Sequence, residues 1–535
     1  MLYVLLADTA IMVKGWTRDL DFLGAYTLRE RKTPEEIREE KERRKIYNRG
    51  QAVKVNNMKY TNKSVISKSE DDPSIVYFLP GLWPRVKEHL DKNGIAYEID
   101  DRRNPDIRPE INYESLAGIE FRENQDVALA LIASADCGII ETATAWGKSF
   151  LISVVCKALP TLNILVCTSS TTVVSTLYEY LCKQLPGEVG IICGTKNTSH
   201  NKRVVVSTLK SVTKINPEHV HLLLCDECHD VGDNMAGREL MKFCFARRFG
   251  FSASPVRNDG SALVMESIFG PTILRMTYEE SVEAGMVTPM KYLMMSCKNG
   301  PSVCKREGLP DVFMKRYAYW ANNYRNKLVQ DIVYDIKKVS DCQILIMVAT
   351  LEHAIYLHML LPWFKVAYYG ATEISDLRKR FPKEKYPNLD LNQYKMNQKQ
   401  LDIMRNAFAK GTLRYVISTT VFRQGVNFTK LQVLVRCDGT TSKVMGIQIP
   451  GRLARLAEDK DYAYLIDFND TFCSWAAGRS RARKSLYAEQ QWIEATREEV
   501  LNDLRTKSVD NTEHSSGELL SHDTGDADED NSATE

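Results

Sequence analysis

Short apolar runs alternate with longer amphipathic segments along residues 120–287 of the chain. The runs are rich in β-branched residues and apolar throughout, which is typical of strands buried on both faces of a parallel sheet. The same alternation of apolar runs and amphipathic segments begins again after residues 285–291. The pattern therefore predicts an α/β fold with two parallel-sheet domains in tandem. The expected strands are residues 138–141, 164–168, 189–193, 203–207, 222–226 and 249–252, then 343–348, 366–369, 415–419, 433–437 and 464–468.

A different pattern precedes these domains. The expected strands there are residues 1–13, 74–78 and 95–99, and the expected helix is residues 83–93. This helix is followed by Gly94, a frequent helix stop. Arg29–Arg49 is dense in both charge signs and predicts a solvated helix. Together these segments predict a small α+β module.

Shifts in composition indicate the domain boundaries. Pro105 and Pro109 mark a linker, residues 376–404 are polar and suggest an insertion, and the last residues have the composition of a disordered segment. We expect an accessory module over 1–112, a first α/β domain over 113–286, a second over 287–506, and a disordered acidic tail over 507–535.

The formal net charge of +2 conceals an uneven distribution. Residues 508–535 hold nine acidic and no basic side chains, so residues 1–507 carry a charge of +11. A basic body with an acidic tail is typical of a polyanion-binding protein. No apolar run approaches the roughly 18 residues of a membrane span, so we expect no membrane partner. Thirteen cysteines, mostly in apolar runs, favour free thiols in a reducing cytoplasm.

Residues 142–149 read Thr-Ala-Thr-Ala-Trp-Gly-Lys-Ser between an expected strand and an expected helix. This is the context of a phosphate-binding loop, although Thr142 replaces the first glycine of the general pattern. Backbone N–H groups at a helix N-terminus favour an anion. Lys148 would add a charge on the β- and γ-phosphates, and the Ser149 hydroxyl would hold Mg²⁺. The expected nucleotide-binding residues of this loop are Thr144, Ala145, Trp146, Gly147, Lys148 and Ser149.

A pair of carboxylates, Asp226 and Glu227, follows a later apolar run. They stand at the end of a strand, where open α/β sheets bind ligands. We expect Asp226 to contact Mg²⁺ through water and Glu227 to polarise the attacking water. Cys225, Cys228 and His229 could suggest zinc, but no second ligand pair at comparable spacing is evident. The loop and the carboxylates together predict nucleoside triphosphate hydrolysis.

Several motifs follow one another in order, at residues 121–125, 142–149, 226–229, 251–260, 418–427 and 448–455. Over roughly residues 118–470 they resemble superfamily 2 helicases of the DEAD/H type. The resemblance implies two RecA-like domains that close over ATP. Among the branches of this family, residues 225–229, 247–255, 283–289 and 324–326, with the N-terminal module, look most like bacteriophage UvsW-like helicases. Those relatives act on branched DNA in replication, recombination and repair.

The resemblance also implies roles for residues outside the loop and the carboxylates. Gln125 would read adenine, Gly425 of the fifth motif would contact the nucleotide, and His229 completes the DExH box. Arg452 and Arg455 would face the ATP of the other domain and stabilise charge on the γ-phosphate. The implied catalytic residues are Lys148, Asp226, Glu227, His229, Gln448, Arg452 and Arg455, with ATP and Mg²⁺ as cofactors.

The expected partner is a nucleic acid, and the resemblance favours branched or single-stranded DNA. The candidate phosphate grips are hydroxyls and amides at strand ends, in residues 168–170, 207–208, 348–350 and 419. RNA stays open, since only 2′-OH contacts distinguish the two. A restriction or nuclease motor and a non-enzymatic scaffold are weaker alternatives, because residues 1–112 show no convincing nuclease site and the nucleotide motifs are complete. We expect a cytoplasmic monomer that meets replication or recombination proteins.

Overall fold

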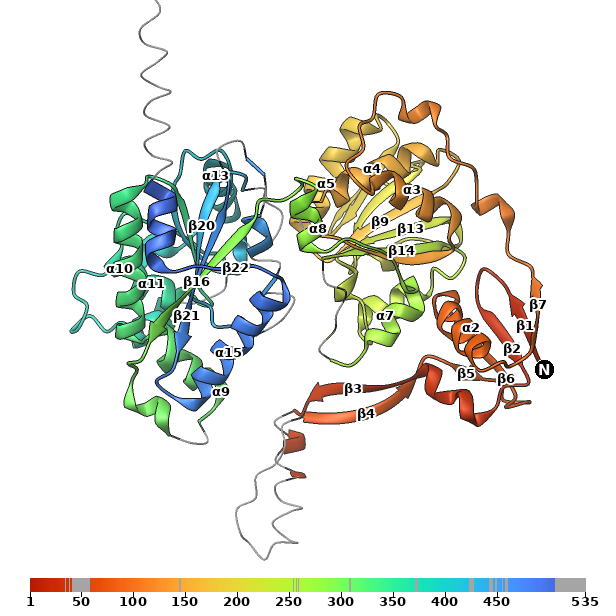
Figure 1. The fold of residues 1–535 in the computed structure, drawn as a ribbon, viewed down its shortest axis with the longest axis horizontal. Helices are drawn as coiled ribbons and strands as arrows, with labels where there is room; N and C mark the ends of the chain where they lie inside the picture. The colour runs from red at the N-terminus through yellow and green to blue at the C-terminus, as the bar shows by residue number, and fades with distance from the viewer. Residues whose placement is uncertain are drawn as a thin grey trace, which may run out of the picture. The chain divides into compact units, whose positions relative to one another are not determined.

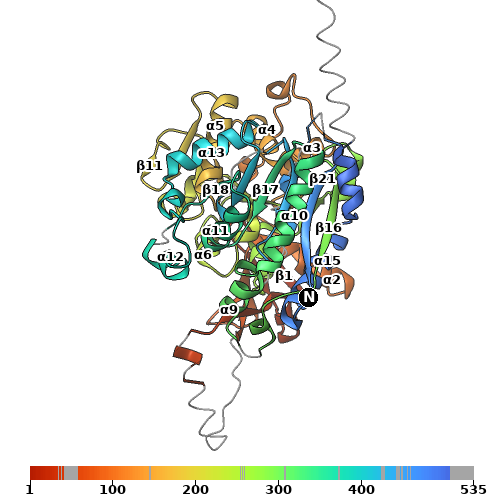
Figure 2. The same ribbon diagram turned by 90° about the vertical axis from the view of Figure 1, so that its left-hand side faces the viewer.

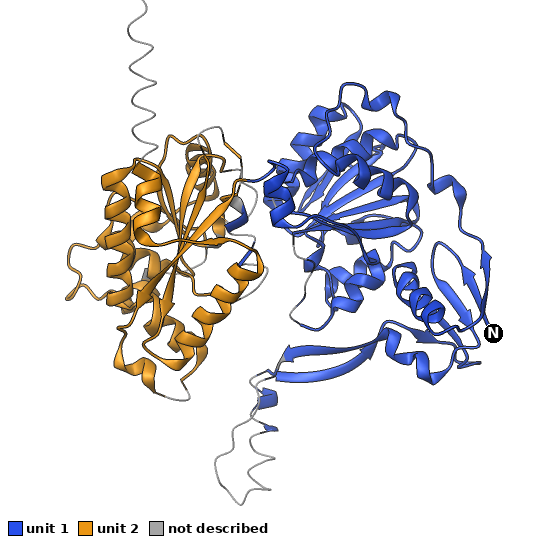
Figure 3. Cartoon of the chain, in the orientation of Figure 1, with its two compact units in different colours: residues 1–287, 443–452 blue, residues 288–442, 453–535 orange. Residues whose placement is uncertain are grey.

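The computed structural model divides the chain into two compact units (Figure 3). Unit 1 comprises Met1–Val287 with Lys443–Arg452, and unit 2 comprises Thr288–Ser442 with Leu453–Glu535. The structure describes residues 1–33, 35–37, 39–40, 58–143, 146–253, 255, 257, 259–306, 309–370, 374–422, 428–441, 446–447, 450–454, 456–457 and 460–505. The predicted acidic tail lies outside these residues. Within them, no helix combines the length and the apolar character needed to cross a membrane.

Unit 1 begins with a five-stranded sheet, the N-terminal sheet, in the order β5-β6-β2-β1-β7. Its elements are β1 Leu2–Leu6, β2 Ile11–Lys14, β5 Ser67–Lys68, β6 Ile75–Phe78, α2 Trp83–Lys92 and β7 Tyr97–Asp101. Alternate residues of β1 are buried, and they share one core with Val86 and Leu90 of α2. The single strand expected over residues 1–13 is wrong. The chain bends at Asp8 and Thr9, two residue types that favour turns, and β1 pairs antiparallel with β2.

Two further strands, β3 (Ala25–Arg31) and β4 (Met58–Ser64), form an antiparallel ribbon of their own (Figure 1). The helix expected over Arg29–Arg49 is therefore wrong at its start, where Arg29 pairs with Tyr60. Apolar and polar residues alternate along Tyr26–Arg29, which is the period of a strand, and the charges that follow obscured it. Residues 41–57, between the two strands, lie outside the described residues.

The N-terminal sheet is fixed directly to the next domain of unit 1. Arg103 and Arg108 both form ion pairs with Asp136, and Arg108 Nη2 also lies 3.1 Å from a carboxylate oxygen of Asp8. Gly81 packs against the backbone of α7 (Ala262–Phe269): a Cβ atom at this position would lie 2.5 Å from two carbonyl oxygens of that helix. The close approach therefore requires glycine.

The central sheet of unit 1 has eight strands in the order β11-β10-β12-β9-β13-β14-β8-β15, parallel except for β10 with β11. Helices α3, α4 and α5 lie on one face and α7 on the other (Figure 1), so strands such as β9, β13 and β14 are buried throughout. Its strands are β8 Cys137–Glu141, β9 Ile164–Thr168, β10 Val189–Cys193, β11 Lys196–Asn197, β12 Val204–Thr208, β13 Leu222–Asp226, β14 Arg247–Ser252 and β15 Thr272–Arg275. Its helices are α3 Gln125–Ser134, α4 Lys148–Ala158, α5 Thr171–Gln184, α6 Met235–Met241, α7 and α8 Tyr278–Glu283.

The C-terminal sheet of unit 2 has seven parallel strands in the order β18-β19-β17-β20-β21-β16-β22. Its strands are β16 Met290–Cys297, β17 Gln343–Met347, β18 Lys365–Ala367, β19 Tyr415–Ser418, β20 Leu431–Arg436, β21 Ala463–Asp470 and β22 Ile493–Glu494. Its helices are α9 Asp311–Lys315, α10 Asn323–Val339, α11 Leu351–Leu360, α12 Ile374–Arg380, α13 Gln398–Ala409 and α15 Ser474–Glu489. Helices α10 and α11 lie side by side (Figures 1 and 2). The predicted pair of parallel-sheet α/β domains is confirmed.

Residues 376–404 do not form a separate polar insertion. They are most of the connection between β18 and β19, and they include α12 and the start of α13. Leu377, Phe381 and Leu401 are buried along this connection. These apolar residues are few and widely spaced in a charged segment, which explains why the sequence suggested an insertion.

The contact at Gly81 gives a prediction about stability. Gly81→Ala should lower the free energy of unfolding by about 1–3 kcal/mol, because the added methyl group overpacks the contact with α7. Urea unfolding followed by circular dichroism measures the change. Gly478→Ala in α15 is the matched control: its Cβ atom meets no heavy atom within 4 Å, so alanine should be neutral or stabilising. Equal effects of the two substitutions would contradict a tight contact at Gly81.

Candidate functional site

Three strand ends meet at one edge of the central sheet. Strand β14 lies between β8 and β13, and all three are parallel. The register pairs Asp226 with Phe251 and Ser252 with Glu141, so the strands end level with one another. Residues 142–149, Asp226 with Glu227, and Ser252 therefore stand next to each other at the carboxyl edge, where open α/β sheets bind ligands.

The phosphate loop, residues 142–149, ends in a conformation that only glycine adopts easily. Gly147 has a φ of +105°, and a Cβ atom there would lie 2.8 Å from Gln125 Nε2. Lys148 begins α4 and is buried, and its Nζ donates to the carbonyl oxygen of Ala143 at 3.4 Å. Ser149 is exposed in the first turn. The predicted residues Thr144 and Ala145 lie outside the described residues.

The segment that precedes α3 braces the phosphate loop. Gln125 Nε2 donates to the carbonyl oxygen of Trp146 at 2.9 Å, and Gln125 Oε1 accepts from the Arg122 N–H at 3.0 Å. The Trp146 side chain is fully buried, with Nε1 3.3 Å from the carbonyl oxygen of Glu123. Gln125 thus positions the loop, and its contact with adenine stays a prediction. Because the Trp146 side chain is buried, a contact of this residue with a nucleotide, which stays a prediction, would involve its backbone.

The acidic pair, Asp226 and Glu227, stands at the buried end of β13. Burial, together with the charge of Glu227, raises the pKa of Asp226 to about 7, and the positive charge of Lys148 opposes this rise. The Glu227 N–H donates to Asp226 Oδ1 at 3.1 Å. Glu227 itself has a φ of 57°, an uncommon conformation for a residue other than glycine. A buried carboxylate whose ionised form is disfavoured is suited to a cation, so the donor set fits Mg²⁺.

His229 joins the acidic pair to the loop after β14. Its Nδ1 lies 3.1 Å from Ser252 Oγ and 3.3 Å from Glu227 Oε2. Burial lowers the pKa of its imidazole, which keeps the ring neutral near pH 7. The carbonyl oxygen of His229 accepts a hydrogen bond from Arg257 Nη1 at 2.5 Å. His229 therefore contacts both the acidic pair and the segment after β14.

The cysteines of the possible zinc motif serve as core residues. Cys225 and Cys228 are fully buried among the apolar side chains between the sheet and its helices. Burial raises the pKa of both thiols well above its ordinary value. Because zinc binds the thiolate form, this environment suits packing rather than metal ligation.

Most of the candidate phosphate grips have local partners. Ser170 Oγ caps α5, and Thr350 Oγ1 caps α11 by accepting from the His353 N–H at 3.3 Å. Thr208 Oγ1 donates to Ser211 Oγ at 2.9 Å. Among the described residues, Thr168 Oγ1 is buried without a hydrogen-bond partner. The polymer contacts of these residues stay predictions.

The motifs predicted in the C-terminal part of the chain are only partly described. Gly425, Gln448 and Arg455 lie outside the described residues. Arg452 ends a short 3₁₀ helix, Pro450–Arg452, of which the backbone is described. The arginine roles that the resemblance implies therefore stay predictions.

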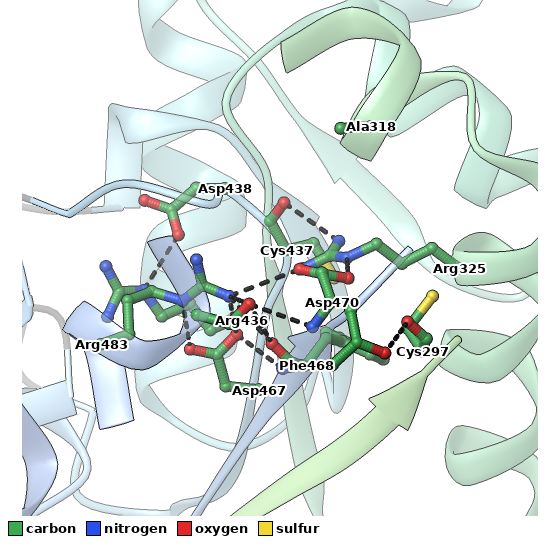
Figure 4. A network of polar contacts seen from close by, with 12 residues as sticks. Cys297, Ala318, Arg325, Arg436, Cys437, Asp438, Asp467, Phe468, Asp470 and Arg483 are labelled. Carbon is green, nitrogen blue, oxygen red and sulfur yellow. Dashed lines mark hydrogen bonds and ion pairs between the residues drawn. The ribbon is translucent and has the colours of Figure 1, made fainter. Parts of the chain in front are cut away.

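A buried network of charges lies at the carboxyl edge of the C-terminal sheet (Figure 4). Its members are Arg325, Arg436, Arg483, Asp438, Asp467 and Asp470, all nearly inaccessible to solvent. The guanidinium Nε atoms of the three arginines lie 3.1, 3.0 and 2.8 Å from carboxylate oxygens of Asp470, Asp438 and Asp467 respectively. The formal charges balance, as buried ion pairs require.

Tyr487 of α15 connects two of these ion pairs. Its hydroxyl donates to Asp467 Oδ2 at 2.6 Å and accepts from Arg436 Nη1 at 2.7 Å. Burial alone would raise the pKa of Asp467, but Arg483 and Arg436 outweigh it and hold the pKa below its ordinary value. The sequence alone did not predict this network. The available signal was a charged residue within or at the end of an otherwise apolar strand, as in Val-Leu-Val-Arg436 and Leu-Ile-Asp467-Phe.

Comparison with known proteins gives matches along the same stretch of chain. The family described as "Type III restriction enzyme, res subunit" matches residues 118–257, and "Helicase conserved C-terminal domain" matches residues 326–457. Together they span about half of the chain, in the order of the two sheets. The chain belongs to superfamily 2 of the helicases. The superfamily predicted from the motifs is confirmed.

Individual relatives of the helicase are distant. A protein named as helicase 22 of Sulfolobus islandicus filamentous virus (isolate Iceland/Hveragerdi) is 21% identical over 428 residues, 72% of this chain and 71% of the relative. S. cerevisiae Dbp5 bound to RNA and ADP BeF3 has 13% identity and a TM-score of 0.50, over 78% of the helicase and 99% of Dbp5. T4 UvsW, the relative anticipated from the motifs, has 14% identity and a TM-score of 0.38, over 92% and 98% of the two chains.

The charge network gives a prediction about unit 2. Arg483→Leu should lower the free energy of unfolding by about 3–5 kcal/mol, because buried Asp467 would lose its ion-pair partner and buried Asp470 one of its two. Arg481→Leu, at an exposed position of the same helix, should change it by no more than about 0.5 kcal/mol. Urea unfolding of both variants tests the difference. A loss at Arg483 as small as that at Arg481 would show that the network contributes no net stability.

Proposed function

We propose that the helicase hydrolyses ATP with Mg²⁺ at the carboxyl edge of the central sheet and uses the reaction to unwind DNA or migrate its branches. One observation carries the proposal: the register of the parallel strands β8, β14 and β13 brings the phosphate loop, with Lys148 buried at the start of α4, next to Asp226 and Glu227 at one edge of the sheet. A buried lysine next to two carboxylates at the carboxyl edge of a parallel sheet is typical of a site that binds a charged ligand.

The chemistry then follows from the groups at this edge. Mg²⁺ would neutralise charge on the β- and γ-phosphates, and the donors that suit it are Ser149 Oγ and Asp226. Lys148 adds a second positive charge on the phosphates. Glu227, adjacent to Asp226 and only half-buried, is placed to orient a water and accept its proton. Gln125 sets the position of the loop through Trp146.

Residues of the later motifs complete the proposal. Gln448, Arg452 and Arg455 would act on the γ-phosphate when the two domains close, and Gly425 would contact the nucleotide. Closing and reopening of two domains is the bistable element that converts hydrolysis into movement along a polymer. His229 contacts both Glu227 and Ser252, so it would couple a change at Glu227 to the segment that follows Ser252.

DNA is the substrate that the sequence favours, since its motifs look like those of UvsW-like helicases and residues 1–507 carry a charge of +11. Roles in replication, recombination and repair follow from that resemblance. Two observations support other candidates. The fold is also that of Dbp5, which was solved with RNA, and the first family match is described as a restriction enzyme subunit. A motor that contacts the phosphates of its substrate could act on DNA, on RNA or as part of a restriction enzyme.

The phosphate loop gives the first test. Lys148→Ala should lower the rate of ATP hydrolysis about 100- to 1,000-fold, because the γ-phosphate loses its nearest positive charge. Lys157→Ala, in the last turn of the same helix, should keep the wild-type rate. A coupled ATPase assay measures both. Normal turnover by the Lys148 variant would refute the assignment of this loop.

The acidic pair gives a second test. Glu227→Gln should still bind ATP but hydrolyse it about 100-fold more slowly, since the amide cannot accept the proton of the attacking water. Binding of a fluorescent ATP analogue and single-turnover hydrolysis separate the two effects. Loss of binding with unchanged turnover of the bound nucleotide would assign Glu227 a different role.

The substrate is identified by the stimulation of ATP hydrolysis. Single-stranded DNA, forked DNA, four-way junctions and single-stranded RNA are added in turn, and the Lys148→Ala variant serves as the background. Greatest stimulation by forked DNA or junctions supports branch migration, whereas stimulation by RNA alone refutes the DNA assignment. Cleavage of the added DNA would identify a restriction or nuclease motor.

A further inference from the structure

The ribbon of β3 and β4 presents one face to solvent and uses the other to contact the central domain. Directly paired residues of an antiparallel ribbon share a face. The outer face carries the pairs Arg29 with Tyr60 and Thr27 with Asn62. All four side chains are exposed, and the Arg29 guanidinium lies 6.0 Å from the centroid of the Tyr60 ring, which is 57% exposed. An exposed aromatic ring beside an arginine offers the two groups that bind single-stranded nucleic acid, a face on which a base can stack and a cation for a phosphate.

The inner face anchors the ribbon near the nucleotide site. The Tyr26 hydroxyl donates to Asp233 Oδ2 at 3.0 Å, and Lys63 Nζ lies 2.5 Å from the same oxygen. Asp233 is in the segment that follows the acidic pair and His229. Leu28, on the same face, is almost completely buried. An isolated two-stranded ribbon is only marginally stable, so these contacts hold it in place.

One edge of the ribbon meets the segment after Ser252. The Arg29 N–H donates to the carbonyl oxygen of Asp259 at 2.7 Å. Gly260 has a φ of +82°, and a Cβ atom there would lie 2.1 Å from the carbonyl oxygen of Thr27. The backbones therefore touch along this edge.

A short chain of contacts leads from that edge to the nucleotide site. Arg257 Nε lies 3.1 Å from Asp259 Oδ1, and Arg257 Nη1 donates to the carbonyl oxygen of His229. His229 in turn contacts Glu227. A shift of the ribbon against Asp259 would thus reach the residue that orients the attacking water.

We propose that the outer face of the ribbon binds a strand of the nucleic acid substrate and that this contact regulates ATP hydrolysis through Asp259 and His229. Tyr60 would stack on a base, Arg29 would pair with a phosphate, and Asn62 and Thr27 would supply hydrogen bonds. Charge complementarity supports a polyanion: residues 41–57, which join the strands, contain six basic residues and one acidic residue in the sequence. The inference rests on the proposed function, because it needs a nucleic acid substrate.

Binding by the outer face is tested with Tyr60→Ala and Arg29→Ala. Fluorescence anisotropy with labelled forked DNA should show about tenfold weaker binding by each, and Arg29→Ala should reduce the slope of log affinity against log salt by about one. The controls are Tyr113→Ala and Arg102→Ala, exposed positions of unit 1 outside the two strands of the ribbon, which should bind as wild type. Wild-type affinity of both ribbon variants would overturn the binding surface. Circular dichroism confirms that the variants fold.

Coupling to ATP hydrolysis is tested with Arg29→Pro against Arg29→Ala. The Val65 N–H donates to the carbonyl oxygen of Gly24, which makes Gly24 and Val65 a hydrogen-bonded pair. Hydrogen-bonded and non-hydrogen-bonded pairs alternate along an antiparallel ribbon, so Arg29 and Tyr60 form a non-hydrogen-bonded pair. Proline at this position removes the N–H that reaches Asp259 while sparing the ladder with Tyr60. Both variants lack the guanidinium, so they should bind forked DNA equally. Stimulation of ATP hydrolysis by that DNA should be at least fivefold smaller for Arg29→Pro.

Each outcome of the coupling experiment has one meaning. Equal stimulation of Arg29→Pro and Arg29→Ala by saturating DNA would overturn the coupling through Asp259. Failure of the proposed function is a different result: the wild-type helicase itself would then show no stimulation by any nucleic acid.

Discussion

Two adjacent carboxylates stand at the buried end of β13, where keeping both of them ionised costs free energy. The arrangement of the candidate nucleotide site depends on how this cost is offset. Asp226 has little solvent around it and a second negative charge beside it, so its ionised form depends on a nearby cation. Lys148 supplies part of that charge because β14 places the ends of β8 and β13 on its two sides. The strand order of one sheet thus decides whether the loop and the carboxylates can act together.

The described end of the phosphate loop is held by the segment that precedes α3. Trp146 is buried, Gln125 holds its carbonyl group, and Gly147 turns the chain into α4. A loop held from one side can keep its remaining N–H groups directed toward an anion without ordering them at the moment of binding. Gln125, which the sequence predicts to read the base, therefore has an observed role in the geometry of the loop.

The two units treat buried charge differently. In unit 1 the acidic pair carries more negative charge than Lys148 compensates, which suits a site that takes up a cation. In unit 2 three arginines and three aspartates compensate one another, and Tyr487 joins two of the pairs. Such a network fixes the positions of the side chains at the carboxyl edge and does not itself supply a reactive group. The ribbon of the N-terminal module adds a third arrangement, in which Arg29 meets the backbone of Asp259 and the Arg257 side chain joins Asp259 to His229.

The sequence by itself determined the two parallel-sheet domains and supplied the candidate residues of the predicted nucleotide site. Apolar strands, a Gly-Lys-Ser turn and a carboxylate pair are local signals, readable wherever short segments have one strong preference. It did not reveal the turn at Asp8, the ribbon that begins before Arg29, or the partners of Arg325, Arg436 and Arg483. Those features depend on contacts between residues far apart in the chain. Only the tertiary structure places Asp259 against Arg29 and Arg483 against Asp467, because strand order and burial, rather than local propensity, decide which distant charges meet.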